Sequence, residues 1–118
     1  MNLYEYITNL GKRFSHPFTL ILISMDTPAG EAAVGEALER DMYFMEQSIR
    51  QTIRNVDILT RYGRQHFLII LLGTDSKGAH IAVDRIFRGY YKMNGNSAHS
   101  PSHLIAEMEG NAPLVQQG

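Results

Sequence analysis

The sequence contains no cysteine, and this absence excludes disulfide bonds and metal sites built on thiolates. It also lacks an excess of either charge, since 11 basic and 12 acidic side chains leave a formal net charge of -1. So weak a field does not favour a non-specific nucleic-acid binder or a protein that adheres to anionic membranes. The lack of cysteine fits a reducing compartment, and we expect a cytoplasmic protein.

Long apolar runs are absent as well. The longest, from Phe67 to Leu72, has six residues, far fewer than the roughly 20 that a membrane-spanning helix requires. The first residues contain neither a basic region nor an apolar core, so we predict no signal peptide. With 44% hydrophobic and 19% charged residues among 118, the composition is that of one compact globular domain.

Hydrophobic periodicity predicts helices in the segments 3–14, 34–56 and 79–90, because apolar residues recur there every three or four positions. We interpret the stripe in the middle segment, the strongest of the three, as a face packed on the core. Thr74 or Asp75 is expected to cap the third helix. The stripes consist of Leu3, Ile7, Leu10 and Phe14; of Val34, Leu38, Met42, Met45, Ile49, Ile53 and Val56; and of Ala79, Val83, Ile86 and Tyr90.

Short apolar runs predict the strands. The run from Phe18 to Ile23 is typical of a strand that is buried on both faces, and turn residues follow it as far as Gly30. Residues 57–62 and 66–72 flank Gly63, which is the spacing of a β-hairpin with glycine in its turn.

The C-terminal part is predicted to be a loop over residues 93–103 and a further strand over residues 104–108. The resulting order of helix, strand, helix, hairpin, helix and strand predicts an α/β (α+β) sandwich. We expect a ferredoxin-like or palm-type sheet with a central β-hairpin and helices packed on it. We accordingly divide the chain into a domain over residues 1–109 and a flexible tail over residues 110–118.

The segment Arg61-Tyr62-Gly63-Arg64-Gln65-His66-Phe67 resembles the hairpin of the GGDEF domains of bacterial diguanylate cyclases, which reads Arg-Tyr-Gly-Gly-Asp-Glu-Phe. Phe18 to Asp26 resembles the first strand of that family, which ends in Asp-x-Asp. Arg54-Asn55-Val56-Asp57 resembles its Arg-x-x-Asp motif, and Asp57 stands six positions before Gly63 as in the family. The resemblance covers residues 3 to 109 and implies a GGDEF-like fold. The family's Asp-x-Leu-Thr-Gly-Leu segment and its last helix and strand have no counterpart, so we expect a domain trimmed at both ends.

The resemblance also implies that the active site is degenerate. In the family two GTP molecules condense across a dimer, and the metal ions are held by the first Asp of Asp-x-Asp and the acidic third residue of the hairpin signature. Those positions are Ser24 and Gln65 here, and neither supplies the negative charge that a hard cation needs beside a triphosphate. Asp26 matches the second Asp, which is the lesser ligand.

Of the other signature positions, Gly63 and Phe67 are kept and the remaining two have changed. His66 replaces the glutamate, and imidazole is a poor ligand for Mg²⁺. Arg64 replaces the second glycine, where it would fill the space in which the family's backbone approaches phosphate and would be strained by a positive φ. Glu39 is the nearest candidate for the family's guanine-reading aspartate, and its guanine-reading asparagine has no counterpart. We therefore expect no enzymatic activity, no metal ion and no cofactor.

Arg54 and Asp57 are the residues to which the resemblance still assigns a function. In active family members the Arg-x-x-Asp motif is the inhibitory product site for cyclic di-GMP. Arginine can donate to guanine O6 and N7, and a carboxylate can accept from guanine N1 and N2. In the alternative, which stays open, Arg54 interacts with a helix C-terminus and Asp57 caps a turn. Arg61 completes the expected ligand-binding set.

His99 and His103 are spaced four apart, but Ser100 and Pro101 between them do not favour a helix, so we interpret the two histidines as polar surface rather than metal ligands. Three functions then compete. The first is a regulatory module that senses cyclic di-GMP, and the second is a dimerisation or protein-interaction module of a larger signalling protein. The third is a divergent cyclase. The expected partners are cyclic di-GMP, a second copy or flanking sensor and effector domains, with neither nucleic-acid binding nor membrane insertion.

Overall fold

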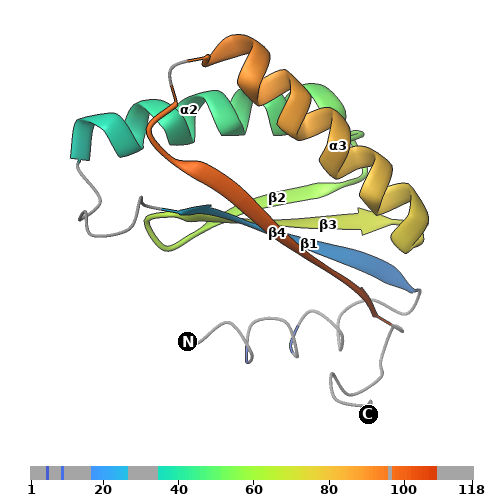
Figure 1. Cartoon of the computed structure of the whole chain (residues 1–118). Coiled ribbons are helices and arrows are strands. Elements are labelled where there is room, and N and C mark those ends of the chain that lie inside the picture. Colours follow the sequence, from blue (N-terminus) through green and yellow to red (C-terminus); the bar gives the residue numbers. More distant parts are fainter. Residues whose placement is uncertain (1–4, 6–8, 10–16, 27–34, 96, 109–118) are drawn as a thin grey trace.

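The structure of the chain, a computed structural model, describes residues 5, 9, 17–26, 35–95 and 97–108 (Figure 1). The elements in this part are strand β1 (Phe18–Asp26), helix α2 (Gly35–Thr52), strands β2 (Ile58–Tyr62) and β3 (His66–Leu72), helix α3 (Ser76–Met93) and strand β4 (Ser100–Met108). Three predictions lie outside the described residues: the helix over 3–14, apart from two isolated residues, the helix start at Val34, and the tail over 110–118.

The strands form one antiparallel sheet in the order β2-β3-β1-β4. β1 pairs with β3 on one side and with β4 on the other, so it lies inside the sheet. β2 and β3 form the predicted hairpin, with Tyr62 opposite His66. The chain order of strand, helix, hairpin, helix and strand is that of a ferredoxin-like fold, and the predicted class is confirmed.

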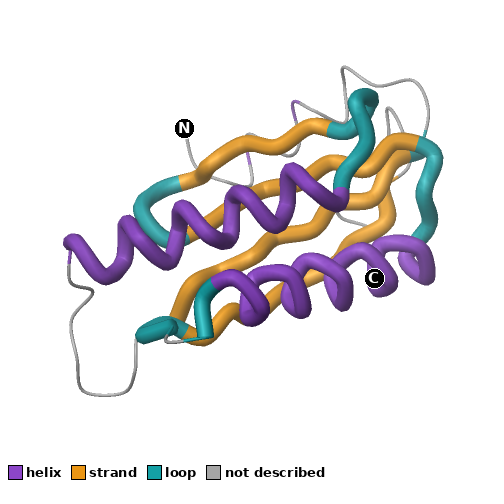
Figure 2. Tube along the Cα trace, turned by 90° about the horizontal axis from the view of Figure 1, so that it is seen from above, coloured by secondary structure: helices purple, strands orange, loops and turns teal. Residues whose placement is uncertain are grey.

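Both helices lie side by side on one face of the sheet (Figures 1 and 2). They approach each other closely at Gly89, where a Cβ would stand 2.5 Å from Ser48 Oγ, so a side chain there would displace the Ser48 hydroxyl that donates to the Ile86 carbonyl. Neither helix is long and apolar enough to cross a membrane. The core beneath them consists of Ile21, Ile23, Met25, Leu38, Met42, Met45, Ile49, Phe67, Ile69, Leu71, Ala79, Val83, Ile86 and Tyr90.

The other face of the sheet is apolar as well. Its buried residues are Phe18, Leu20, Leu68, Ile70 and Met108, which form a second cluster. Successive side chains of β1 and β3 therefore point alternately into two apolar environments. This explains why both strands are continuous apolar runs in the sequence, and it confirms that β1 is buried on both faces.

α2 ends at Thr52, earlier than the apolar stripe predicted. Val56 is 57% exposed in the turn that leads to β2, so its assignment to the buried helical face is wrong. The reason is local, because the Arg54 N–H donates to Asp57 Oδ2 at 2.8 Å and the Asp57 N–H donates to the Arg54 carbonyl at 3.0 Å. A side chain that accepts from the nearby backbone stabilises a turn in place of a further helical turn.

β4 begins at Ser100, so the prediction of a loop through His103 is wrong from that residue onward. Every residue of β1 has a partner in β4, up to Asp26 opposite Ser100, and this pairing outweighs the low strand propensity of the segment. Pro101 is tolerated because β4 is an edge of the described sheet. The strand predicted over residues 104–108 is confirmed as the second half of β4.

α3 agrees with its prediction at the N-terminus and extends further at the C-terminus. The Asp75 carboxylate accepts from the Gly78 N–H at 2.9 Å, which confirms a cap at one of the two expected residues. The helix continues to Met93, the first residue of the predicted loop. Its buried residues are the four of the predicted stripe.

A buried carboxylate connects α2 to the segment between α3 and β4. The Asp41 side chain is 0% exposed and accepts hydrogen bonds from Asn94 Nδ2 at 2.7 Å and from the Ala98 N–H at 3.0 Å. His99 Nδ1 lies 2.6 Å from Asp41 Oδ2. His99 is itself only 4% exposed, so its interpretation as polar surface is wrong.

Burial by itself would raise the pKa of Asp41, but hydrogen bonds from His99, Asn94 and the Ala98 N–H outweigh this effect and lower the pKa below its usual value of 3.8. The carboxylate is therefore ionised at neutral pH, and its partners stabilise the charged form. Because the pKa is lower in the folded state, this stabilisation is present above the unfolded pKa and is lost as the pH falls through the folded pKa.

We predict that Asp41→Asn lowers the free energy of unfolding by about 1–3 kcal/mol at neutral pH, because an amide leaves buried donors without an acceptor. The difference from wild type should shrink below pH 3.8, where wild-type Asp41 loses its own stabilisation. Urea unfolding at neutral pH and below pH 3.8 measures the free energy of unfolding of the variant and of wild type. Asp84→Asn is the control, since the Asp84 side chain is 60% exposed, and equal losses in the two variants would contradict the assignment.

Candidate functional site

The turn of the hairpin lies against the end of β1. Gly63 has a φ of +68°, a left-handed conformation that side chains disfavour, so this turn requires glycine. The Met25 N–H donates to the Gln65 carbonyl at 2.8 Å, and Gln65 Nε2 donates to the Met25 carbonyl at 2.8 Å. Ser24 pairs in register with His66. The structure thus brings Ser24, Gln65 and His66 together, as the resemblance implied.

These side chains offer no carboxylate. Ser24 supplies a hydroxyl, and the Gln65 amide is bound to the main chain of β1. A hard divalent cation beside phosphate needs anionic oxygen ligands, and neither residue supplies one. Asp26, the last residue of β1, is exposed. Within the described residues, no three His, Cys, Asp or Glu side chains are grouped closely enough to hold a metal ion.

Arg61 and its neighbours lie at the end of β2 that leads into the hairpin turn. Arg61 Nη2 lies 3.0 Å from Glu39 Oε2 on α2 and donates to the Arg64 carbonyl at 3.3 Å. Glu39, the nearest candidate for a guanine-reading acid, is thus paired with an arginine. The rings of Tyr62 and His66 are tilted by 60° to each other, with their centroids 6.1 Å apart. Arg61 therefore belongs to the hairpin end.

Arg54 and Asp57 face each other in the turn between α2 and β2. Arg54 Nη2 lies 3.0 Å from Asp57 Oδ1, and Nε lies 3.3 Å from Oδ2. Asp57 Oδ1 also accepts from the Leu72 N–H at 3.3 Å. Arg54 Nη2 donates to the Leu72 carbonyl at 2.6 Å and to Thr74 Oγ1 at 3.2 Å. The pair therefore fastens this turn to the end of β3 and to the connection with α3.

The two members of the pair differ in exposure, since the Asp57 side chain is 1% exposed and that of Arg54 is 55%. Hydrogen bonding to Asp57, and its charge, raise the pKa of Arg54. Burial would raise the pKa of Asp57, but hydrogen bonds from Arg54 and Leu72 outweigh it and hold that pKa below 3.8. Asp57 is ionised and turned inward. The Nη1 donors of Arg54 have no partner among the residues that the structure describes.

A pocket of about 250 Å³ lies beside this pair. Its lining combines two aliphatic side chains with an amide, a carboxylate and two arginines, and the arginines can donate hydrogen bonds to an anionic ligand. Of the lining residues, the sequence interpretation had singled out Arg54 and Asp57 as a site. It missed Arg50, although Arg50 precedes Arg54 by four positions, the spacing of neighbours on a helical surface. The lining consists of Arg50, Ile53, Arg54, Asn55, Asp57 and Leu59.

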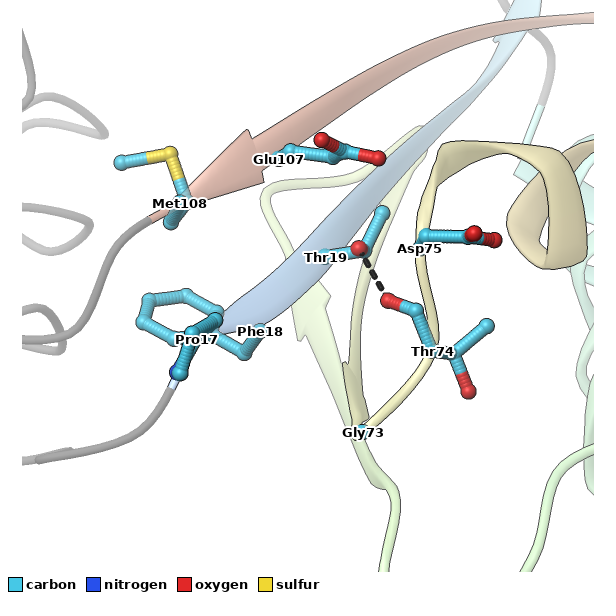
Figure 3. Close-up of a pocket in the computed structure, with 8 residues that line it drawn as sticks. All are labelled: Pro17, Phe18, Thr19, Gly73, Thr74, Asp75, Glu107 and Met108. Atoms are coloured by element: carbon cyan, nitrogen blue, oxygen red, sulfur yellow. Dashed lines mark hydrogen bonds between the residues drawn. The ribbon is translucent and has the colours of Figure 1, made fainter.

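A larger pocket of about 370 Å³ is lined by the start of β1, by the connection between β3 and α3 and by the end of β4 (Figure 3). Its polar groups have partners within the fold. The Thr19 hydroxyl donates to the Thr74 carbonyl, and the Glu107 carboxylate accepts from the Ser76 N–H at 2.5 Å. Asp75 caps α3. We therefore regard the smaller pocket, beside the exposed Arg54, as the candidate site.

Comparison with known proteins supports the fold. No protein-family model matches the sequence, and no curated protein matches it significantly. Solved structures do: the FimX GGDEF domain from Pseudomonas aeruginosa has a TM-score of 0.65 at 20% identity, over 93% of this chain and 72% of that chain. A DGC protein from Thermotoga maritima has a TM-score of 0.64 at 14% identity, over 87% of this chain and 72% of that chain. An EAL/GGDEF domain protein from M. capsulatus has a TM-score of 0.63 at 22% identity, over 85% of this chain and 72% of that chain. The chain has the fold of GGDEF domains.

We predict that Gln65→Glu, which restores an acidic residue at the signature position, destabilises the fold at neutral pH. The new carboxylate would face the Met25 carbonyl, which now accepts from Nε2 at 2.8 Å, and the lost donor should cost about 1–3 kcal/mol. Since the folded state would disfavour the charged form, the pKa of the introduced group would rise. The loss should therefore diminish as the pH falls. Urea unfolding against pH tests this, with Gln51→Glu at an exposed helical position as control. Equal stability in both variants would contradict it.

Proposed function

We propose that this chain is a catalytically silent GGDEF-like signalling domain that binds cyclic di-GMP at the pocket beside Arg54. The fold supports the signalling class, because the solved structures that it resembles include GGDEF domains. The observation that carries the proposal is the guanidinium of Arg54, which a buried carboxylate holds in one orientation at the edge of a pocket. Cytoplasm is the compartment in which such a domain would meet guanine nucleotides.

The catalytic silence rests on charge. Joining two GTP molecules requires the 3′ hydroxyl of one to attack the α-phosphate of the other while metal ions neutralise the phosphates. Ser24 and Gln65 stand at the positions that the resemblance assigns to metal ligands, and both are uncharged. Restoring one charge would not suffice, since the Gln65 amide is part of the contact between the hairpin and β1.

The binding function rests on Arg54. Guanine O6 and N7 are acceptors that arginine recognises well, and the Nη1 donors, which have no partner among the described residues, can donate to them. Asp57 lines the pocket, but its side chain is 1% exposed and its carboxylate accepts from Arg54 and Leu72, so we assign it the role of positioning the guanidinium. The volume of about 250 Å³ is below the roughly 300–1,000 Å³ of pockets that enclose whole small molecules. The pocket would hold one base, and the rest of the dinucleotide would lie over the surface.

A second function is favoured by a different observation, the exposed edge of the sheet. β4 is an edge of the described sheet, and Leu104 on it is 64% exposed. An open edge with an exposed apolar side chain can pair with another chain. In this alternative the domain binds no nucleotide and contacts a second copy or a flanking sensor or effector domain.

We predict that the protein forms no cyclic di-GMP when it is incubated with GTP and Mg²⁺ or Mn²⁺. Chromatography of the reaction measures the product, and an active diguanylate cyclase shows that the assay works. Product that increases with protein concentration, and disappears in a Ser24→Ala and Gln65→Ala double variant, would refute the silence of the site.

We predict that the wild-type protein binds cyclic di-GMP and that Arg54→Ala weakens binding by about 1–3 kcal/mol, the value of one good arginine–guanine contact. Isothermal titration calorimetry measures both affinities, and thermal unfolding confirms that the variant is folded. Arg61→Ala is the matched control, because Arg61 pairs with Glu39 away from this pocket. Equal affinities in wild type and Arg54→Ala would refute the site, and no binding by wild type would favour the alternative.

A further inference from the structure

Arg50 lies in the last turn of α2 and lines the pocket beside Arg54. Its Nε lies 2.9 Å from Glu46 Oε2, one helical turn earlier. The side chains of Arg50 and Glu46 are 58% and 33% exposed, so water screens the attraction between them. Arg50 is therefore held weakly, in contrast to Arg54, whose partner Asp57 is buried.

The position of Arg50 matters for any anion that enters this pocket. The pocket lies at the C-terminal end of α2, where the helix dipole carries partial negative charge and disfavours an anion. The charge of Arg54 is largely compensated by Asp57 at 3.0 Å. Among the lining residues, Arg50 is thus the cation whose charge is available to a phosphate once it leaves Glu46.

We propose that Arg50 is a phosphate-binding residue of this site, which exchanges the Glu46 carboxylate for a phosphodiester oxygen when a guanine base occupies the Arg54 pocket. The inference rests on the proposed function and deepens it. Arginine and phosphate match as a bidentate, charge-assisted pair, which is stronger than an exposed pair on one helix. Glu46 then competes with the ligand for Arg50 and sets the affinity, so removing its charge strengthens binding.

The test is calorimetric titration of the full chain with cyclic di-GMP. Arg50→Ala should bind about tenfold more weakly than wild type. Arg50→Lys should fall between the two, because a lysine keeps the charge but loses the bidentate geometry. Glu46→Gln should bind about twofold more tightly, the value of an exposed helical ion pair. The affinity of Arg50→Ala should also depend less steeply on salt concentration than that of wild type.

Arg88→Ala is the control, because Arg88 forms the same kind of exposed pair with Asp84, four positions away on α3. It should bind as wild type does. If wild type binds and Arg54→Ala binds more weakly, while Arg50→Ala binds as tightly as Arg88→Ala, the role of Arg50 is refuted and the proposed function stands. If Glu46→Gln weakens binding, the competition between Glu46 and phosphate is refuted. If wild type does not bind at all, the proposed function and this inference are both overturned.

Discussion

The antiparallel pairing of β1 with β3 determines where both candidate sites lie. At one end of β3 it places Ser24 of β1 opposite His66, and Gln65 bonds to Met25. At the other end Leu72 accepts from Arg54. β3 has seven residues, so its ends are separated by roughly 20 Å, beyond any direct contact. Substitutions at the hairpin end therefore need not disturb the Arg54 pocket.

The two ends also differ in how their charges are compensated. At the hairpin end an uncharged amide donates to a main-chain carbonyl, and the arrangement is stable only while the residue there can donate. At the Arg54 end a carboxylate is buried and ionised, and removing Arg54 would leave that buried charge without its cation. The fold alone is a sufficient reason to retain Arg54 and Asp57. The outward donors of the Arg54 guanidinium take no part in these contacts within the fold, so a binding function would have to use them.

The sequence predicts those parts of this structure that depend on interactions between residues close together in the chain. The periodic stripes of α2 and α3, the glycine turn at Gly63 and the continuous apolar runs of β1 and β3 follow from neighbouring residues, and all were predicted. The strand at residues 100–103 was not, because its pairing partner lies about 75 positions earlier in the chain and its own residues favour a loop. Asp41 and His99 are 58 positions apart, and each by itself is typical of a surface. In the candidate site, the spacing of Arg54 and Asp57 predicted their proximity. The inward direction of Asp57 depends on Leu72, whose N–H donates to Asp57 Oδ1 and which the spacing does not include.

That inward direction changes what the motif can do. A carboxylate that reads guanine N1 and N2 must face the ligand, whereas here it holds the arginine that would do the reading. An arginine fixed before binding loses less side-chain entropy on binding, so the same hydrogen bonds yield a higher affinity. Arg50 is in the opposite situation, because an exposed glutamate holds it weakly and it can move toward a phosphate at little cost. A rigid contact for the base next to an adjustable contact for the phosphate would make base identity the stricter requirement. The site would then discriminate among nucleotides mainly by their bases and tolerate variation in how their phosphates are linked.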